Sequence, residues 1–314
     1  MDKIHIRHQI INNCNYRCPI CSYEGEEIPE IMGGCGMNKT LLSDENVISL
    51  MEEVVNIVGS NNISYAITGG EPTLRKDLLI KMVKRLNDLD IEDIWLNTNG
   101  FLLNSEYLDE LKDAGLKHVK ITISSMDFLK YAKAIGYQGN ISWAKKALKK
   151  VLYNTDCCIE NGLKVDINIP LQERINDSYE DLEPYFNFSK RGVLVKVLVL
   201  EPSGWKGFPK RENYIPPIDV HDFLKSMGGK KISDFDFSRG GLYEFDTGNN
   251  EKVTIAGIYF CSPADAKNHP YAGRSFLVTS DGQIKKGMWG DEGKTKLKIE
   301  HTTVLERQLR SILN

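Results

Sequence analysis

Three cysteines stand close together near the start of the chain, with a spacing suited to metal chemistry. Cys14, Cys18 and Cys21 follow a CxxxCxxC pattern within eight residues. One loop can therefore present three sulfurs to one metal centre, and thiolate is the soft ligand that selects iron-sulfur clusters or zinc. A structural zinc site normally closes with four protein ligands. Three thiols without a nearby fourth ligand favour an iron-sulfur cluster in which one iron stays open to a substrate or cofactor.

A zinc knuckle is the alternative interpretation of the same cysteines. It needs a fourth ligand from another part of the chain, such as Cys35, which stands in a Gly-rich segment. The coordination argument favours the cluster, because the motif itself offers only three thiols. Tight binding of zinc in place of iron would support the knuckle.

A second motif, Gly69-Gly70-Glu71-Pro72, follows a predicted strand. Together with the CxxxCxxC pattern it resembles the radical S-adenosylmethionine (radical SAM) superfamily. The resemblance implies that the three cysteines hold a 4Fe–4S cluster whose open iron is chelated by the methionine part of SAM. It also implies that the four residues of the second motif bind SAM, with their backbone and the Glu71 side chain meeting its amino group.

The composition is that of an ordinary globular protein. The chain has 314 residues, of which 41% are hydrophobic and 26% charged, enough for a substantial core. The formal net charge of -3 gives no general attraction to nucleic acid or anionic lipid, although a local basic patch is compatible with it. No apolar run is long enough to span a bilayer, and the first residues lack a signal-peptide core. Seven cysteines without a disulfide framework suit a reducing compartment, so we expect a cytoplasmic protein without a nucleic-acid or membrane partner.

Hydrophobic periodicity predicts six strands separated by helices. The predicted strands are 3–11, 63–67, 93–96, 119–123, 165–169 and 193–200. The first predicted helix is capped by Ser43 and has its apolar face over 47–58. Four further helices are predicted over 78–86, 107–111, 142–160 and 179–186. Because each parallel connection needs a crossover helix, this order predicts an α/β fold, a partial (β/α)6 TIM-like barrel of parallel strands. The radical SAM resemblance implies the same open barrel.

Polar residues stand at the carboxyl ends of the predicted strands, where barrels of this kind carry their chemistry. By resemblance, four of them occupy positions that contact the ribose and the aminocarboxylate of SAM: Thr98, Ser124, Ser125 and Asn168. Ordinary loop chemistry is the alternative for each residue taken singly. Their collection on one edge of the barrel favours a site.

The alternation of strands and helices stops near Gly204. We therefore expect a radical SAM partial-barrel domain over residues 1–203 and a smaller C-terminal α+β region over 204–314 that caps the substrate. Two hairpins are predicted there, over 242–260 with a turn at 248–250 and over 275–289 with a turn at Asp281-Gly282. A terminal helix is predicted over 303–313.

Within the superfamily the sequence resembles the GTP cyclase of molybdopterin biosynthesis. The matching segments are 69–75, 97–100, Asn168, Asn176-Asp177 and 274–282. That family uses three C-terminal cysteines to hold a second cluster, whereas this chain has only Cys261 in its C-terminal region. Asp166 stands where that family places a Lys. These departures predict a relative that retains radical generation and acts on a different substrate.

Two residues of the C-terminal region are the predicted catalytic candidates, Cys261 and Arg274. Cys261 is read either as a small buried hydrophobe or as a hydrogen-atom donor or acid near the substrate, as in radical epimerases. Arg274 matches a substrate-facing Arg of the cyclase, and a guanidinium suits phosphate or carboxylate. Weaker substrate anchors, more often solvated, are Lys196, Lys267, His269, Lys285 and Lys286. The adjacent Cys157 and Cys158 are expected to be structural.

The sequence therefore predicts a radical SAM enzyme of the oxidoreductase or lyase type. By resemblance, a reductase such as flavodoxin or ferredoxin supplies one electron, SAM is cleaved to methionine and a 5'-deoxyadenosyl radical, and the radical abstracts hydrogen from a small molecule. We expect a nucleotide, nucleoside or sugar derivative in natural-product or cofactor biosynthesis as the substrate. A peptide-modifying epimerase or crosslinking maturase is the alternative. A non-catalytic metal or electron-transfer protein is disfavoured, because it has no use for a SAM motif.

Overall fold

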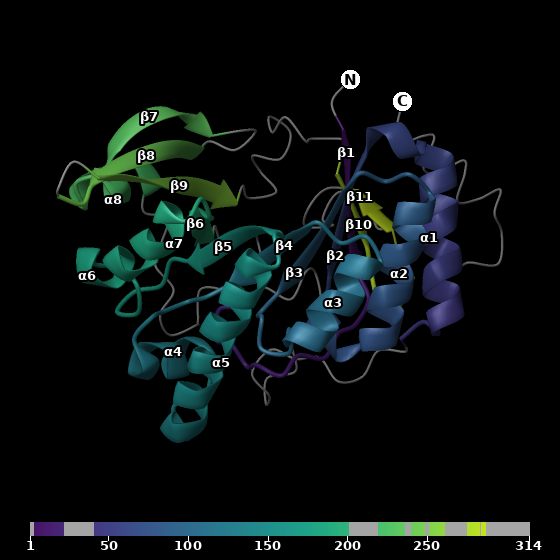
Figure 1. The fold of residues 1–314 in the computed structure, drawn as a ribbon, viewed down its shortest axis with the longest axis horizontal. Coiled ribbons are helices and arrows are strands. Elements are labelled where there is room, and N and C mark those ends of the chain that lie inside the picture. Colours follow the sequence, from purple (N-terminus) through teal and green to yellow (C-terminus); the bar gives the residue numbers. More distant parts are fainter. Residues whose placement is uncertain are drawn as a thin grey trace.

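Six parallel strands form the centre of the computed structural model, which describes residues 3–21, 41–200, 219–235, 240–248, 251–260, 275–282 and 284–286 (Figure 1). The strands are β1 (Ile4–Gln9), β2 (Ile63–Thr68), β3 (Asp93–Thr98), β4 (His118–Thr122), β5 (Lys164–Pro170) and β6 (Leu194–Leu200). The crossover helices are α1 (Asp44–Val58), α2 (Lys76–Asp88), α3 (Ser105–Asp113), α4 (Phe128–Ala134), α5 (Ile141–Glu160), α6 (Tyr179–Leu182) and α7 (Phe186–Lys190). Each parallel pair is thus joined through helix, as the crossover rule requires.

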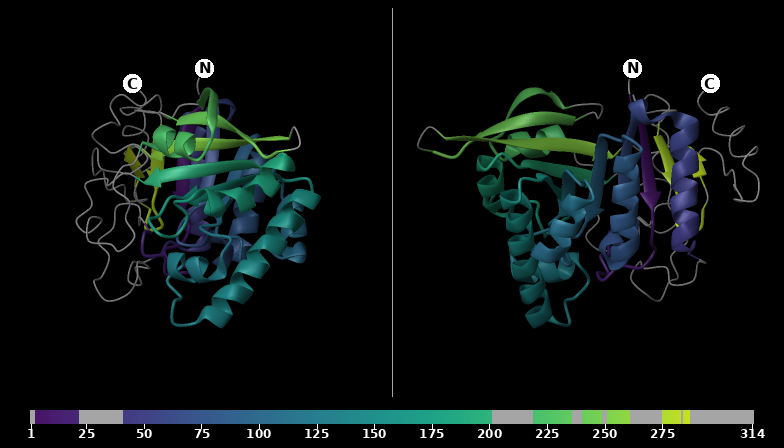
Figure 2. Two further views of the ribbon diagram at one scale, coloured as in Figure 1. Left: turned by 90° about the vertical axis from the view of Figure 1, so that its left-hand side faces the viewer. Right: turned by 45° about the vertical axis from the view of Figure 1, so that its right-hand side comes forward.

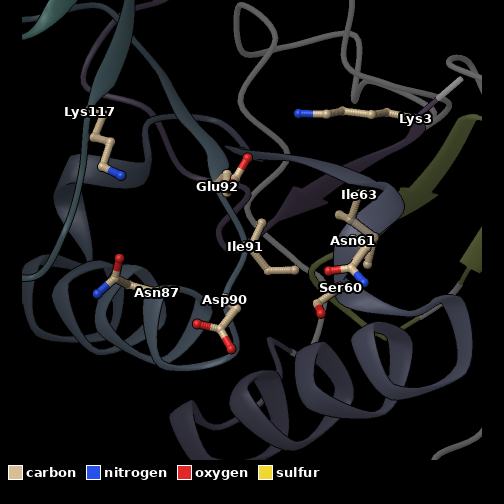
Figure 3. A pocket seen from close by; sticks show the side chains of 9 residues that line it. All are labelled: Lys3, Ser60, Asn61, Ile63, Asn87, Asp90, Ile91, Glu92 and Lys117. Atoms are coloured by element: carbon tan, nitrogen blue, oxygen red, sulfur yellow. The ribbon is translucent and has the colours of Figure 1, made fainter. Parts of the chain in front are cut away.

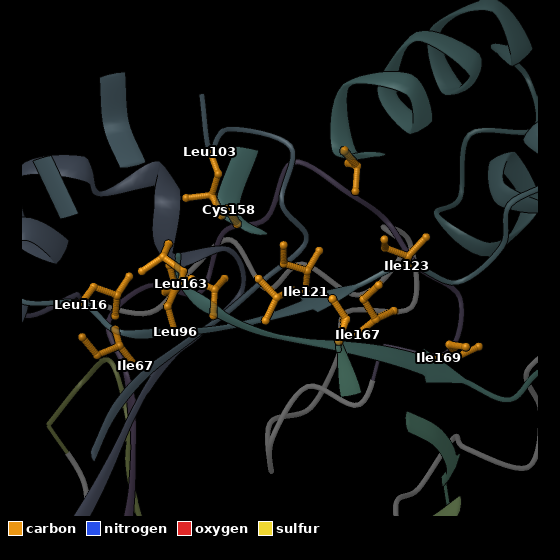
Figure 4. Close-up of a cluster of buried hydrophobic side chains, with 14 of the residues drawn as sticks. Ile67, Leu96, Leu103, Leu116, Ile121, Ile123, Cys158, Leu163, Ile167 and Ile169 are labelled. Carbon is orange, nitrogen blue, oxygen red and sulfur yellow. The ribbon is translucent and has the colours of Figure 1, made fainter. Parts of the chain in front are cut away.

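One face of the strands packs against the helices and forms the core. Ile67, Leu96, Ile121 and Ile167 come from four neighbouring strands, and their side chains are fully buried (Figure 4). Cys158 of α5 lies in the same cluster, and burial raises the pKa of its thiol to about 12. This placement suits the structural role expected for Cys158.

The opposite face of these strands is polar, because side chains alternate along a strand. The register places Arg7 of β1 and Trp95 of β3 on either side of Ala66, and it places Lys120 of β4 next to Asp166 of β5. We call this surface of β1 to β6 the inner face. It carries the charged side chains of Arg7, Lys120 and Asp166, whereas the other face is mostly apolar.

The C-terminal strands extend the sheet at both edges. α8 (Val220–Ser226) precedes β7 (Lys230–Phe235), β8 (Gly240–Asp246) and β9 (Lys252–Phe260), and β10 (Ser275–Val278) pairs with β11 (Ile284–Lys286). β9 lies parallel to β6 and β10 lies parallel to β1, which gives the order β11-β10-β1-β2-β3-β4-β5-β6-β9-β8-β7. Figure 2 shows the two groups of C-terminal strands at opposite ends of the sheet. Within the described residues β7 and β11 do not pair, so the sheet stays open.

The six predicted strands are confirmed, as is the partial barrel with its smaller C-terminal α+β region. The hairpin over 242–260 is confirmed as β8 and β9, and the hairpin that begins at Ser275 is confirmed up to Lys286. Sequence reasoning missed α4, α8 and β7. The terminal helix over 303–313 lies outside the described residues, and the division at residue 203 stays a prediction.

The single helix predicted over 179–186 is wrong. The structure has α6, a 3-10 turn over Glu183–Tyr185, and then α7. Pro184 is the physical reason, because it has no backbone N–H to continue the α-helical ladder. In the part of the chain that the structure describes, no helix combines the length and apolar character needed to cross a bilayer.

Candidate active site

The CxxxCxxC segment forms the loop that leaves the carboxyl end of β1. Cys14, Cys18 and Cys21 are all partly exposed. The backbone N–H of Tyr16 donates to Cys14 Sγ at 3.3 Å, and the N–H of Cys21 donates to the carbonyl of Cys18 at 3.0 Å. We call residues 10–21 the cysteine loop. It presents three soft thiol donors at the edge of the sheet where parallel barrels carry their chemistry.

The three thiols do not form a site for a single metal ion. Among the described residues, no group of three His, Cys, Asp or Glu side chains lies close enough together to hold a metal ion. The donor types nevertheless fit an iron-sulfur cluster, because one loop supplies three accessible thiols without a carboxylate or imidazole among them. Ligation by these three cysteines stays a prediction.

The second motif is hydrogen-bonded to the cysteine loop, backbone to backbone. The N–H of Gly70 donates to the carbonyl of Ile11 at 2.7 Å, and the N–H of Glu71 donates to the carbonyl of Asn13 at 2.9 Å. A Cβ at Gly69 would lie 2.4 Å from the Ile11 oxygen, and a Cβ at Gly70 would lie 2.3 Å from the Asn13 oxygen. The two glycines are therefore required for the two segments to approach each other.

The Glu71 side chain ties the same turn to the end of β3. Its carboxylate accepts hydrogen bonds from the N–H and hydroxyl of Thr73, from the Thr98 hydroxyl at 2.6 Å and from the Asn99 N–H at 2.7 Å. Burial raises the pKa of this carboxyl, and the donors oppose that shift by favouring the charged form. Glu71 and Thr98, both predicted as SAM-binding residues, are thus brought together, although their contact with SAM stays a prediction.

Asn99 connects this network back to the cysteine loop. Its side-chain amide donates to Asn15 Oδ1 at 2.7 Å and lies 3.8 Å from Cys14 Sγ. The side-chain oxygen Oδ1 of Asn99 accepts a hydrogen bond from the backbone N–H of Phe101 at 3.0 Å, which fixes the side chain in this orientation. One residue thus links the end of β3, the Glu71 carboxylate and the segment that carries the first cysteine.

The turn after α4 also forms hydrogen bonds with the cysteine loop. The N–H of Arg17 donates to the carbonyl of Ile135 at 3.0 Å, and the Tyr137 hydroxyl donates to the carbonyl of Asn15 at 2.9 Å. The hydroxyls of Tyr16 and Tyr131 lie 2.9 Å apart in the core. Sequence reasoning missed these residues. The helix cap at Asp127 was the available local signal, because its side chain accepts from the N–H groups of residues 129 and 130.

The other predicted SAM residues lie further along the same edge. The Ser125 hydroxyl accepts from the N–H of Asp127 at 3.1 Å, so it also positions the start of α4. The Ser124 carbonyl accepts from the side chain of Asn176 at 2.7 Å. Asn168 lies on the inner face of β5, where its register partners are Thr122 and Lys196. Ser124 and Ser125 have local structural roles, whereas Asn168 faces the polar side of the sheet.

Charged side chains cluster on the inner face of β4, β5 and β6, beside Asn168 and on its amino-terminal side. Lys196 forms an ion pair with Asp166, and His118 Nε2 lies 3.0 Å from the same carboxylate. Burial opposes ionisation of Asp166, but His118 and Lys196 outweigh it and hold the pKa of the carboxyl below its usual value. This ion pair was not expected, although Lys196 was a predicted substrate anchor.

Lys120 lies beside that pair. Its side-chain nitrogen lies over the face of the Trp95 ring. Within the described residues it forms no ion pair with a carboxylate. Burial, followed by repulsion from Lys196, lowers the pKa of Lys120 well below its usual value. The inner face therefore holds an amine at an aromatic ring, and a bound anion would stabilise its charged form.

The candidates Cys261, Arg274 and Cys35 lie outside the described residues, as do Lys267 and His269. A cavity of about 360 Å³ occurs at the opposite, amino edge of the sheet (Figure 3). It is lined by Lys3, Ser60, Asn61, Ile63, Asn87, Asp90, Ile91, Glu92 and Lys117. None of these is a predicted site residue, and they precede β1 to β4 or begin them, so this cavity is separate from the candidate active site.

Comparison with known families matches residues 9–182 to the Radical SAM superfamily. The "Probable GTP 3',8-cyclase" of Methanococcus aeolicus is 32% identical over 91% of this chain and 86% of its own length. The "GTP 3',8-cyclase" of Rippkaea orientalis is 34% identical over 98% of this chain and 90% of its own length. A solved structure described as "Native anSMEcpe with bound AdoMet" covers 98% of this chain and 82% of that chain with a TM-score of 0.62 at 18% identity, a likeness of fold.

Proposed function

This chain belongs to the radical SAM superfamily, and we propose that it abstracts hydrogen from a small anionic metabolite, a nucleotide, nucleoside or sugar derivative. The cofactors of the family are SAM and a 4Fe–4S cluster. We assign the cluster to Cys14, Cys18 and Cys21. The observation that carries this assignment is the direct backbone pairing of Gly70 with Ile11 and of Glu71 with Asn13, which joins the two family motifs into one site.

The chain's own residues would position SAM and exclude water. The bound cluster supplies the single electron that cleaves SAM. The Gly69–Pro72 turn would hold the aminocarboxylate end of SAM beside the cysteine loop, and Glu71 keeps that turn rigid through Thr98 and Asn99. Ser124, Ser125 and Asn168 extend the same edge toward the inner face, where we place the rest of SAM and the substrate.

The charges of the inner face support an anionic substrate. Lys196 offsets Asp166, while Lys120 is held over Trp95 without a carboxylate partner in the described part of the chain. A phosphate or carboxylate would stabilise the charged form of this buried amine through charge-assisted hydrogen bonds. The relatives named GTP 3',8-cyclase support a nucleotide or a related compound as the substrate class. The single C-terminal thiol, Cys261, argues for a substrate other than that of a two-cluster enzyme.

Cys261 and Arg274 are our proposals for substrate chemistry in the C-terminal region. Arg274 would bind a phosphate or carboxylate, and Cys261 would donate a hydrogen atom or a proton. Arg274→Ala should raise the KM for the substrate without changing SAM cleavage in its absence. An unchanged product from Cys261→Ala would end the proposal for the thiol.

Anaerobic reconstitution with iron and sulfide tests the whole assignment. The protein should then convert SAM to 5'-deoxyadenosine in the presence of dithionite, and a matching nucleotide or sugar should increase the rate. Cys18→Ala should abolish both iron binding and product, whereas Cys157→Ala on α5 should retain them. Tight zinc binding without iron uptake would overturn the cluster, and stimulation by peptides alone would overturn the substrate class.

Lys120→Met tests the anionic substrate separately. The variant should raise the KM for the stimulating substrate and leave substrate-independent SAM cleavage unchanged. Lys81→Met on α2 is the matched control, because Lys81 is an exposed residue of a crossover helix. We further propose a cytoplasmic location, a flavodoxin or ferredoxin as the electron donor, and no nucleic-acid or membrane partner.

A further inference from the structure

Positive charge is concentrated on α4 and α5. Residues 128–155 contain six lysines and neither Asp nor Glu, in a chain whose formal net charge is -3. Lys130 pairs with Asp181, and the other five side chains are exposed. We call these five the α4–α5 basic face: Lys133, Lys145, Lys146, Lys149 and Lys150. Figure 1 shows the two helices lying side by side.

The helix geometry directs four of these lysines to solvent. Ala144, Ala147, Leu148 and Val151 of α5 are buried against the core, so the lysines at 145–146 and 149–150 occupy the opposite side. Like charges four residues apart destabilise a helix, and within the described residues none of these four forms an ion pair. Lys145 and Lys150 lie over the rings of Phe128 and Phe101, but these contacts leave the repulsion along α5 without an opposite charge, which points to a binding role.

The basic face adjoins the cysteine loop. Tyr137 donates its hydroxyl to the Asn15 carbonyl, and its ring stacks on Trp143 of α5 at a centroid distance of 4.2 Å. The Lys150 ammonium lies 4.5 Å from the ring centroid of Phe101, which follows the Asn99 segment. Arg17, an exposed cation of the loop itself, is bonded through its N–H to Ile135. The turn after α4 and the start of α5 thus connect, through Tyr137 and Trp143, to the loop that carries the three thiols.

We propose that the α4–α5 basic face docks an acidic electron-transfer protein, a flavodoxin or ferredoxin, beside the cysteine loop. This inference rests on the proposed function, because the electron needs the cluster as its acceptor. In the step the carrier loses one electron and the cluster gains one, and no covalent bond forms or breaks. Complementary charge would speed the encounter and orient the carrier so that its redox group faces the loop. The location beside the thiols favours such a carrier over a nucleic acid.

Charge reversal tests this proposal. The variant K145E/K146E/K149E/K150E should raise the KM for reduced flavodoxin by at least about tenfold in SAM cleavage, since steering charges change association rates by that order or more. The rate with dithionite, a small reductant that needs no docking surface, should not change. The control K81E/K84E reverses exposed lysines on α2 and should behave as wild type with both reductants. Added salt should weaken the wild-type response to flavodoxin, because screening acts over about 10 Å at 0.1 M.

A binding measurement separates docking from catalysis. Titration calorimetry of oxidised flavodoxin against the purified chain should give a Kd that rises in the quadruple variant and stays constant in the α2 control. Lys→Gln at the same four positions should give a smaller shift in the same direction, which covers the case in which charge reversal unfolds the protein.

Unchanged Kd and KM would overturn the docking surface, as would an equal loss of rate with dithionite. Loss of RNA-oligonucleotide binding with unchanged flavodoxin binding would assign the face to nucleic acid. Absence of SAM cleavage with either reductant in the wild type would contradict the proposed function, while the Kd values would still decide the docking.

Discussion

The backbone N–H of Gly70 lies 2.7 Å from the carbonyl oxygen of Ile11, so the SAM motif and the cysteine loop are hydrogen-bonded neighbours although more than fifty residues separate them. This pairing leaves no room for a side chain at Gly70. Crowding of this kind distinguishes a glycine needed for the close approach of two segments from one that merely permits a turn.

Gly70→Ala should displace the cysteine loop. The new Cβ would meet the carbonyl oxygens of Asn12 and Asn13 at 2.4 and 2.3 Å, so one backbone has to move. We expect a loss of about 1–3 kcal/mol in the free energy of unfolding, typical of overpacking, and reduced iron uptake after reconstitution. Gly139→Ala is the control, since nothing lies within 4 Å of its Cβ position. Normal iron content in Gly70→Ala would contradict the role of the close approach.

Gly136→Ala should disturb the loop from its other side. Gly136 has φ +75°, and an added Cβ would lie 2.1 Å from the Arg17 carbonyl oxygen. Gly162 shares φ +75° with nothing within 4 Å, so Gly162→Ala reports the backbone cost alone, about 1 kcal/mol. Only Gly136→Ala should also reduce iron uptake. Equal unfolding free energies and equal iron contents in the two variants would show that α4 does not hold the loop.

Asp166→Asn should strongly destabilise the protein. It leaves the buried Lys196 ammonium without its carboxylate partner, which typically costs about 3–5 kcal/mol. The double variant Asp166→Asn/Lys196→Met should recover part of that loss, because it removes the unpaired charge as well. Urea unfolding of Asp166→Asn, of Lys196→Met and of the double variant gives the coupling energy between the two side chains. If the losses in unfolding free energy simply add, the two side chains do not interact directly.

His8 should make the protein less stable in acid. Burial, followed by the nearby Arg75 charge, lowers the pKa of His8 to about 3, and its Nδ1 lies 2.7 Å from the Tyr65 hydroxyl. Below its unfolded pKa of about 6.5 the unfolded chain therefore binds a proton that the folded chain does not, until the pH reaches the folded pKa. The free energy of unfolding should fall by up to about 1.4 kcal/mol per pH unit across this window. His8→Asn should show a shallower decline in urea titrations between these pH values, and an unchanged slope would contradict the assignment.

The sequence alone determined the cysteine spacing, the Gly69–Pro72 motif and the order of the six central strands. These features are local, because a ligand set in one loop and the periodicity of a strand are both written in neighbouring residues. The expected family and the partial barrel followed from them. The single helix predicted over 179–186 is wrong, because hydrophobic periodicity does not register that Pro184 lacks the N–H needed to continue an α-helix.

Only the tertiary structure decided which distant residues hold the site. Tyr16 meets Tyr131 across 115 positions, and no local periodicity records that contact. The pairing of β9 with β6 and of β10 with β1, which carries the C-terminal strands to both edges of the sheet, is equally non-local. The ion pair of Asp166 with Lys196 depends on the register of β5 against β6. Strand partners and register are chosen by the packing of the whole sheet, and this is why a single sequence without its fold could not name them.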